Sequence, residues 1–120
     1  MKTLLWLDDM RNPFVMPDWL LQYAPEYHYE KDNGTHQIVW VTDHNKLADW
    51  ITENGVPTVV GFDHDLGIGK HSGYDSAKWL VQYCAEHNVM LPQYFIQSAN
   101  PVGKENIDRY LQNAKKHMAL

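Results

Sequence analysis

The sequence predicts an α/β fold in which four parallel strands form one sheet and helices cover both of its faces. Short apolar runs without polar alternation are typical of strands that are buried on both sides. Helical patterns fill the intervals between these runs, which indicates repeated βαβ units. Right-handed crossovers with helices on both faces then place the first strand inside the sheet, in the order 2-1-3-4. With 120 residues, the chain 1–120 is expected to be one domain.

Four apolar runs are the expected strands. The first ends at two aspartates, and Pro92 introduces the last. The runs are Thr3–Leu7, Ile38–Val41, Thr58–Phe62 and Tyr94–Gln97.

Capping residues predict the helices that follow the last three strands. Thr42 or Asp43 begins a helix that Asn54-Gly55 ends, and Ser72 begins a second one. Asn100 followed by proline predicts an N-cap and the first position of a third helix, Pro101–Lys116.

Residues 12–36 carry mixed signals, because three prolines interrupt them. Asp18–Tyr23 predicts one short helix. The alternation of Tyr27–Lys31 and the tight-turn pair Asn33-Gly34 favour an added antiparallel β-hairpin that leads into the second strand of the sheet.

Composition and charge exclude several classes of protein. Hydrophobic residues make up 44% and charged residues 21%, which is ordinary for a globular protein. A formal net charge of -5 argues against a grip on duplex DNA. The single Cys84 rules out an internal disulfide, and acids interrupt the apolar N-terminal run too soon for a signal peptide. We expect a cytoplasmic protein without a membrane span, either a monomer or a weak dimer.

Acidic side chains follow two of the expected strands at the point where each strand ends. Asp8 and Asp9 follow the first strand, Asp63 and Asp65 the third, and Ser98 follows the fourth. The carboxyl ends of parallel strands meet at one edge of the sheet, where ligands bind, so these side chains should converge. One such Asp alone is explained equally well by a functional site and by a role as a helix cap or turn former. Two acidic pairs and a serine in one layer favour a carboxylate site for Mg²⁺ or Mn²⁺.

Three further side chains near these acids have both a functional and a plainer interpretation. His64, between Asp63 and Asp65, is either a structural histidine or a general acid or base. Lys104 in the first turn of the last helix, and Arg11 after the first strand, are either solvated surface charges or phosphate ligands, since cations and helix N-termini suit phosphate oxygens.

Four segments, LWLDDMRNP, GFDHDLG, SGYDSAKWL and SANPVGKENI, together resemble a receiver domain. The resemblance implies a three-layer, CheY-like (flavodoxin-like) fold. Receivers carry an acid pair after the first strand, which Asp8 and Asp9 match, and a phosphoacceptor after the third, which Asp63 matches. They carry Ser or Thr before Ala after the fourth strand, as in Ser98-Ala99. The position of Asp65 is one where receivers give a backbone carbonyl to Mg²⁺.

The chain departs from ordinary receivers in two ways. It is truncated after the last helix, without the fifth strand and its phosphate-contacting lysine, for which Lys104 is a candidate substitute. It also carries an Asp-His-Asp signature, which ordinary receivers lack. Together with Asp-Asp-x-Arg-x-Pro and Ser-x-Asn, these features are similar to the cyclic-phosphate processing receiver-like domain of bacteria and phages. Many of its members have His where this chain has Gln97.

The resemblance and the acids imply a Mg²⁺- or Mn²⁺-dependent phosphoesterase that acts on a phosphate ester, such as a cyclic phosphate of a nucleotide or an RNA end. The alternative is a non-hydrolytic module that binds a nucleotide or a protein, or takes a phosphoryl group, and a phage-encoded, host-interacting protein in the host cytoplasm belongs to this alternative. The missing lysine argues against relay signalling, and Gln97 favours binding alone. The expected metal ligands are Asp8, Asp9 and Asp63, the catalytic residues Asp63, His64 and Asp65, and the phosphate ligands Arg11, Ser98, Asn100 and Lys104.

Overall fold

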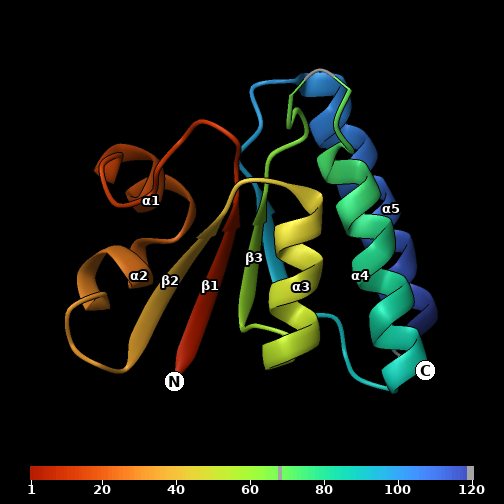
Figure 1. The fold of residues 1–120 in the computed structure, drawn as a ribbon, viewed down its shortest axis with the longest axis horizontal. Coiled ribbons are helices and arrows are strands. Elements are labelled where there is room, and N and C mark those ends of the chain that lie inside the picture. Colours follow the sequence, from red (N-terminus) through yellow and green to blue (C-terminus); the bar gives the residue numbers. More distant parts are fainter. Residues whose placement is uncertain (68, 119–120) are drawn as a thin grey trace.

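The computed structural model describes residues 1–67 and 69–118. It contains a parallel sheet of four strands in the order β2-β1-β3-β4, which confirms the predicted order (Figure 1). Leu4 of β1 pairs with Ile38 on one side and with Val59 on the other, so β1 lies inside the sheet. The strands are β1 (Lys2–Leu7), β2 (His36–Val41), β3 (Val59–Phe62) and β4 (Gln93–Ile96).

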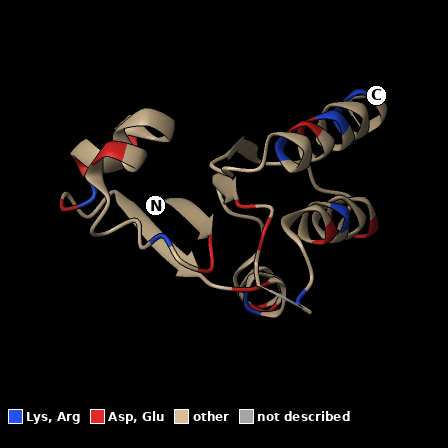
Figure 2. Ribbon diagram, turned by 90° about the horizontal axis from the view of Figure 1, so that it is seen from above, with Lys and Arg blue, Asp and Glu red and all other residues tan. Residues whose placement is uncertain are grey.

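Helices cover both faces of the sheet and make a three-layer fold, as Figure 2 shows from above. One face carries α3 (His44–Asn54), α4 (Gly73–His87) and α5 (Pro101–Met118), and the other carries α1 (Pro17–Tyr23) and α2 (Pro25–Glu30). The predicted caps are confirmed, because the side chains of Asp43, Ser72 and Asn100 accept hydrogen bonds from backbone N–H groups in the first turns of α3, α4 and α5.

Alternate residues of β1 supply the two cores of the protein. Leu5 and Leu7 pack under α3, α4 and α5, whereas Leu4 and Trp6 pack under α1 and α2. Each of these four side chains is fully buried. The period of two in a strand explains why one apolar run serves both faces. The central strand is therefore fixed from both sides, and so is the point at which it ends.

The predicted hairpin in residues 12–36 is wrong. A helix, α2, occupies Pro25–Glu30, where a strand was expected. Pro17 and Pro25 stand at the beginning of α1 and α2, a position where proline lacks only an N–H group that has no partner in the helix. Leu20 and Tyr27 are buried against the sheet. The Asn33-Gly34 turn is present, with a Gly34 φ of 75°, but it joins a helix to β2.

No helix in the described part of the chain is long and apolar enough to cross a membrane.

Candidate functional site

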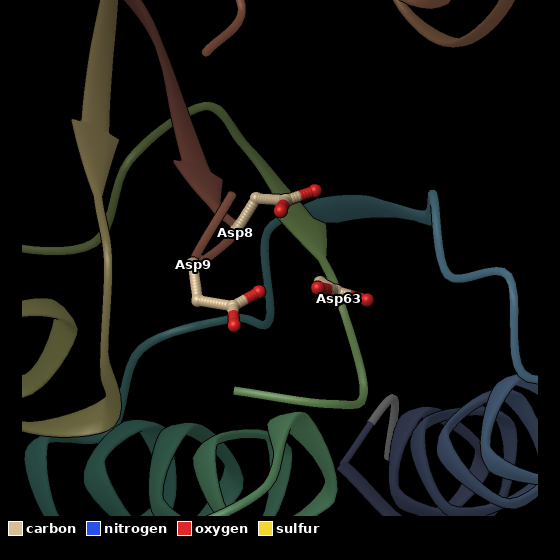
Figure 3. A group of neighbouring side chains, drawn as sticks. All are labelled: Asp8, Asp9 and Asp63. Carbon is tan, nitrogen blue, oxygen red and sulfur yellow. The ribbon is translucent and has the colours of Figure 1, made fainter. Parts of the chain in front are cut away.

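Three carboxylates converge where β1 and β3 end. Asp8 and Asp9 follow β1, and Asp63 follows β3. One oxygen of each lies within 4.8 Å of the other two, and Figure 3 shows the three side chains side by side. Asp8 and Asp63 are buried, whereas Asp9 is partly exposed and lines a cavity. The structure thus brings together the three residues that the sequence predicts as metal ligands.

The loop that carries Asp8 is fixed by tryptophans and by a cation. Trp40 donates from its indole N–H to the Asp8 carbonyl at 2.8 Å, and Trp6 donates to the Arg11 carbonyl at 2.9 Å. The Asp8 carboxylate accepts from the backbone N–H of Arg11 at 2.9 Å and from the Arg11 guanidinium at 3.3 Å. The guanidinium also lies 4.2 Å from the ring centroid of Trp19. Asp8 is therefore held in one orientation before any ligand arrives.

Asp63 is the most perturbed acid of the site. Burial raises its pKa to about 7, and the charges of Asp8 and Asp9 act in the same direction. The Arg11 guanidinium opposes this rise, with Nη1 3.9 Å from Asp63 Oδ2. One cation shared among three carboxylates leaves negative charge uncompensated in a buried place. Hard oxygen donors with excess negative charge are what Mg²⁺ and Mn²⁺ prefer, so the residues present fit such an ion.

Two glycines let helices approach the segment that follows Asp63. A Cβ atom at position 73 would lie 1.8 Å from the Asp63 carbonyl oxygen, and the Gly73 N–H donates to the His64 carbonyl at 2.8 Å. A Cβ at position 103 would lie 2.3 Å from the His64 ring. The first turns of α4 and α5 therefore pack directly on Asp63 and His64.

His64 and Asp65 form a hydrogen-bonded pair beside the carboxylate cluster. His64 Nδ1 lies 2.9 Å from Asp65 Oδ1, and the Asn100 amide lies 3.4 Å from Asp65 Oδ2. The hydrogen bond with His64, with a smaller effect from Asn100, lowers the pKa of Asp65. An acid with a lowered pKa is ionised at neutral pH and has no proton to donate. The arrangement suits His64 for proton transfer and Asp65 for orienting its ring.

A cavity of about 740 Å³ opens above the cluster. Its wall includes Lys70, which comes from the glycine-containing loop between β3 and α4. Sequence reasoning did not select Lys70, and only its place after Gly69 and before the α4 cap could have pointed to it. The cavity is lined by Asp9, Met10, Arg11, Met16, Asp63, His64, Asp65, Leu66, Gly67, Lys70, Ser72 and Ala99.

The other expected phosphate ligands lie beside this cavity or away from it. Ser98 is buried, and its Oγ accepts from the Asn100 N–H at 3.1 Å. The Asn100 side-chain oxygen caps α5 by accepting from the Gly103 N–H at 3.0 Å. Lys104 lines a different cavity, where its Nζ lies 5.7 Å from the ring centroid of Tyr23. Of the four expected phosphate ligands, Arg11 alone is part of the cavity wall above the carboxylates.

Gln97 is fully buried below the site. Its amide donates to the Leu7 carbonyl at 2.8 Å, and its side-chain oxygen has no hydrogen-bond partner among the described residues. The side chain therefore links the ends of β1 and β4 across β3.

A three-layer fold with sheet order 2-1-3-4 and an acid cluster at the carboxyl ends of β1 and β3 defines a receiver domain. Residues 3–113 match the family model described as "Cyclic-phosphate processing Receiver domain". The chain belongs to this family. A search of curated proteins found no match.

Solved structures resemble the chain in fold. One is a yeast Spc42 trimeric coiled-coil segment fused to another protein, with a TM-score of 0.57 and 14% identity over 90% of this chain. The chain spans 62% of the length of that structure. The receiver domain of NtrX from Brucella abortus has a TM-score of 0.46 and 13% identity, with 94% of this chain and 98% of that domain covered. The N-terminal domain of a response regulator receiver protein from Methanoculleus marisnigri JR1 has a TM-score of 0.45 and 10% identity, with 94% of this chain and 95% of that domain covered.

Proposed function

We propose that the protein is a Mg²⁺- or Mn²⁺-dependent phosphoesterase that opens or removes a phosphate ester, with a cyclic phosphate of a nucleotide or an RNA end as the substrate class. The observation that carries this proposal is the convergence of one oxygen each of Asp8, Asp9 and Asp63 within 4.8 Å of one another, with Asp9 and Asp63 in the wall of the cavity. The family name supports the choice of a cyclic phosphate.

Asp8, Asp9 and Asp63 would hold the metal ion. A divalent cation bound by these oxygens neutralises charge on the phosphate and polarises a phosphoryl oxygen. Arg11 keeps Asp8 and Asp63 in place by its contacts at 3.3 and 3.9 Å. Trp6 fixes the backbone carbonyl of Arg11, and the guanidinium lies 4.2 Å from the ring centroid of Trp19.

His64 is proposed to move the proton of the reaction. Hydrolysis of a cyclic phosphate forms a bond from a water oxygen to phosphorus and breaks one ester P–O bond. The departing ribose oxygen takes a proton, and the attacking water loses one. His64 lines the cavity beside Asp63, and Asp65 fixes its ring through Nδ1, which leaves Nε2 for this proton. Lys70 supplies the cationic contact to the phosphate oxygens that Lys104 is not placed to make.

A second function is favoured by Gln97. This side chain has no titratable group and is bound to the Leu7 carbonyl under the sheet edge, where many family members have histidine. A site without that histidine would bind a phosphorylated nucleotide through the same carboxylates and cations and release no product.

One experiment separates the two functions. The protein is incubated with 2′,3′-cyclic mononucleotides, with RNA oligonucleotides that end in a cyclic phosphate, and with phosphomonoesters, each with Mg²⁺, Mn²⁺ or chelator. Product is followed by ³¹P NMR and chromatography, and binding by calorimetry. Metal-dependent ring opening or phosphate release, lost in Asp63→Asn, supports the esterase. Metal-dependent binding without product refutes the esterase and supports the binding module.

A further inference from the structure

The segment 10–16, which joins the end of β1 to α1, exposes apolar side chains beside the carboxylate cavity (Figure 1). Met10 is 82% exposed, Val15 70% and Phe14 55%. A single exposed apolar side chain is ordinary, but several of them in one short segment beside a cavity are typical of a binding surface. The segment begins directly after Asp9, so a ligand that it binds lies next to the carboxylate cluster.

Hydrogen bonds hold the backbone of this segment in place. One carboxylate oxygen of Asp8 accepts from the N–H groups of Met10 and Arg11 at 3.1 and 2.9 Å. The Phe14 N–H donates to the side-chain oxygen of Asn12 at 2.9 Å. These N–H groups are already bonded, so the segment offers a ligand mainly apolar contact, at a fixed distance from the carboxylates.

Met10 and Met16 form an apolar part of the cavity wall, and Asp9 and Asp63 belong to the same wall. The cavity volume of about 740 Å³ lies within the range of about 300–1,000 Å³ that is typical of pockets for whole small molecules. A phosphate group at the carboxylates therefore fills only a part of the cavity. The rest is open to the group that is esterified to the phosphate.

We propose that Met10 and Met16 bind the base of a nucleotide whose phosphate lies at the carboxylate cluster. This inference rests on the proposed function and identifies the residues that would select a nucleotide among phosphate esters. A methionine thioether makes favourable contacts with aromatic rings, and its flexible side chain adapts to the shape of the ring. The base of a ribose cyclic phosphate lies one sugar away from phosphorus, and this apolar wall likewise begins one residue after Asp9.

A membrane surface is a poorer occupant of the segment than a nucleotide. Asp9 and Asp63 line the same cavity, and Asp18 is exposed in the first turn of α1. These carboxylates, with a net charge of -5 on the chain, would repel negatively charged lipid head groups. A nucleobase is neutral, and the charge of its phosphate is balanced by the metal ion and by Lys70 in the cavity wall.

The test compares two ligands that share the ribose and the cyclic phosphate but differ in the base. One is 2′,3′-cyclic AMP, and the other is methyl riboside 2′,3′-cyclic phosphate, in which a methoxy group replaces the base. Affinity for the full chain with Mg²⁺ or Mn²⁺ is measured as Kd by calorimetry, or as KM where product forms. We expect the wild type to bind cyclic AMP at least about tenfold more tightly than the base-free ligand.

Variants of Met10 locate the base. Met10→Ala should weaken binding of cyclic AMP about three- to tenfold and leave the affinity for the base-free ligand and any kcat unchanged. Met10→Phe should restore the affinity for cyclic AMP, because a phenyl ring also stacks on a base. Met90→Ala is the matched control, since Met90 is 86% exposed and lies outside the cavity wall, and it should change neither affinity.

Three results would overturn the proposal. Equal affinity of the wild type for both ligands, or equal weakening of both by Met10→Ala, would refute the base site and leave the phosphate site intact. An alkyl phosphate that binds as tightly as cyclic AMP, with the same dependence on Met10, would show that the wall accepts any apolar group. Absence of metal-dependent binding of both ligands would refute the proposed function, and the base site with it.

Discussion

The cavity above the carboxylates and the groove beside β4 belong to one fold but expose different chemical groups. The groove is lined by all of β4 and by α5 residues between Lys104 and Lys115. The base of the cavity concentrates charge, because three carboxylates converge there and the Arg11 guanidinium contacts two of them, Asp8 and Asp63. Along the groove, the outward N–H and C=O groups of β4 have no neighbouring strand among the described residues. Buried charge that is uncompensated favours a cation, whereas unpaired N–H and C=O groups favour another backbone. The two surfaces therefore differ in chemistry, and Lys70 lines the first whereas Lys104 lines the second.

The largest expected effect comes from Asp63→Asn, which removes the central carboxylate of the cavity. Mg²⁺ at saturating concentration should raise the Tm of the wild type by about 5 °C or more, by mass action. The variant should lose this rise and at least about 100-fold of any esterase rate, yet remain folded, because the substitution relieves repulsion. Differential scanning calorimetry with Asp49→Asn, an exposed acid, as control measures this. A retained metal response in Asp63→Asn would place the ion elsewhere.

His64→Ala should separate chemistry from metal binding. The metal-dependent rise in Tm should persist, because His64 is not one of the three converging carboxylates. The rate should fall by about 10²–10⁴-fold, the usual contribution of a general acid or base. Asp65→Asn keeps a hydrogen-bond acceptor near Nδ1 of His64, so its rate should fall less than that of His64→Ala. Steady-state rates and calorimetry are measured on the same samples. Loss of the metal-dependent rise in Tm in both variants would contradict this assignment.

Lys70→Ala and Lys104→Ala form a matched pair that sharpens the comparison of the two surfaces. Lys70→Ala should raise KM for a phosphate ester about tenfold, the loss of one charged hydrogen bond. Lys104→Ala should leave KM unchanged, since its ammonium group lies over Tyr23 in the groove. Initial-rate kinetics, or titration with nucleotide if no turnover occurs, measures both. The opposite result would show that the phosphate site extends to α5.

The last expected effect is a dependence of stability on pH. The pKa of Asp63 is about 7 in the fold, against 3.8 ordinarily, so between these values the folded state holds a proton that the unfolded chain releases. Without metal, the free energy of unfolding should therefore fall as pH rises from about 4 to 7. The gain in Tm from Mg²⁺ should instead grow between pH 6 and 8, because protons compete for Asp63. Calorimetry of Asp63→Asn should show neither this fall in the free energy of unfolding nor this growth of the Mg²⁺-dependent gain in Tm.

Much of the sheet and its acidic edge could be predicted, because both depend on local patterns. Apolar runs mark strands buried on two faces, and an acid directly after a strand must lie at its carboxyl end. The order of the strands then brings Asp9 and Asp63 together without knowledge of any side-chain contact. Caps at Asp43, Ser72 and Asn100 fixed the helix beginnings equally well.

The short helix predicted at Asp18–Tyr23 is confirmed as α1, but α2 and the place of Lys70 in the cavity wall could not be predicted in the same way. Proline at position 25 interrupts one pattern and begins another, and burial of Tyr27 against the sheet decides between them. Lys104 lies close to Ser98 in sequence, yet the direction of α5 carries it into the groove. Lys70 reaches the cavity through the path of a loop, which no periodicity describes. The role of a residue that is placed by the path of a loop or a helix can be assigned only from the three-dimensional structure.

The close packing of α4 and α5 on the site has a consequence for protein engineering. Replacement of helical glycine by alanine is a standard way to raise thermal stability, because alanine favours helix. Gly73 and Gly103 both lie in first turns of helices and would be chosen by such a scheme. At these positions the added methyl group would collide with the Asp63 carbonyl and the His64 ring. A stabilisation campaign should therefore leave both glycines unchanged, because there the usual remedy would displace the groups around which the site is built.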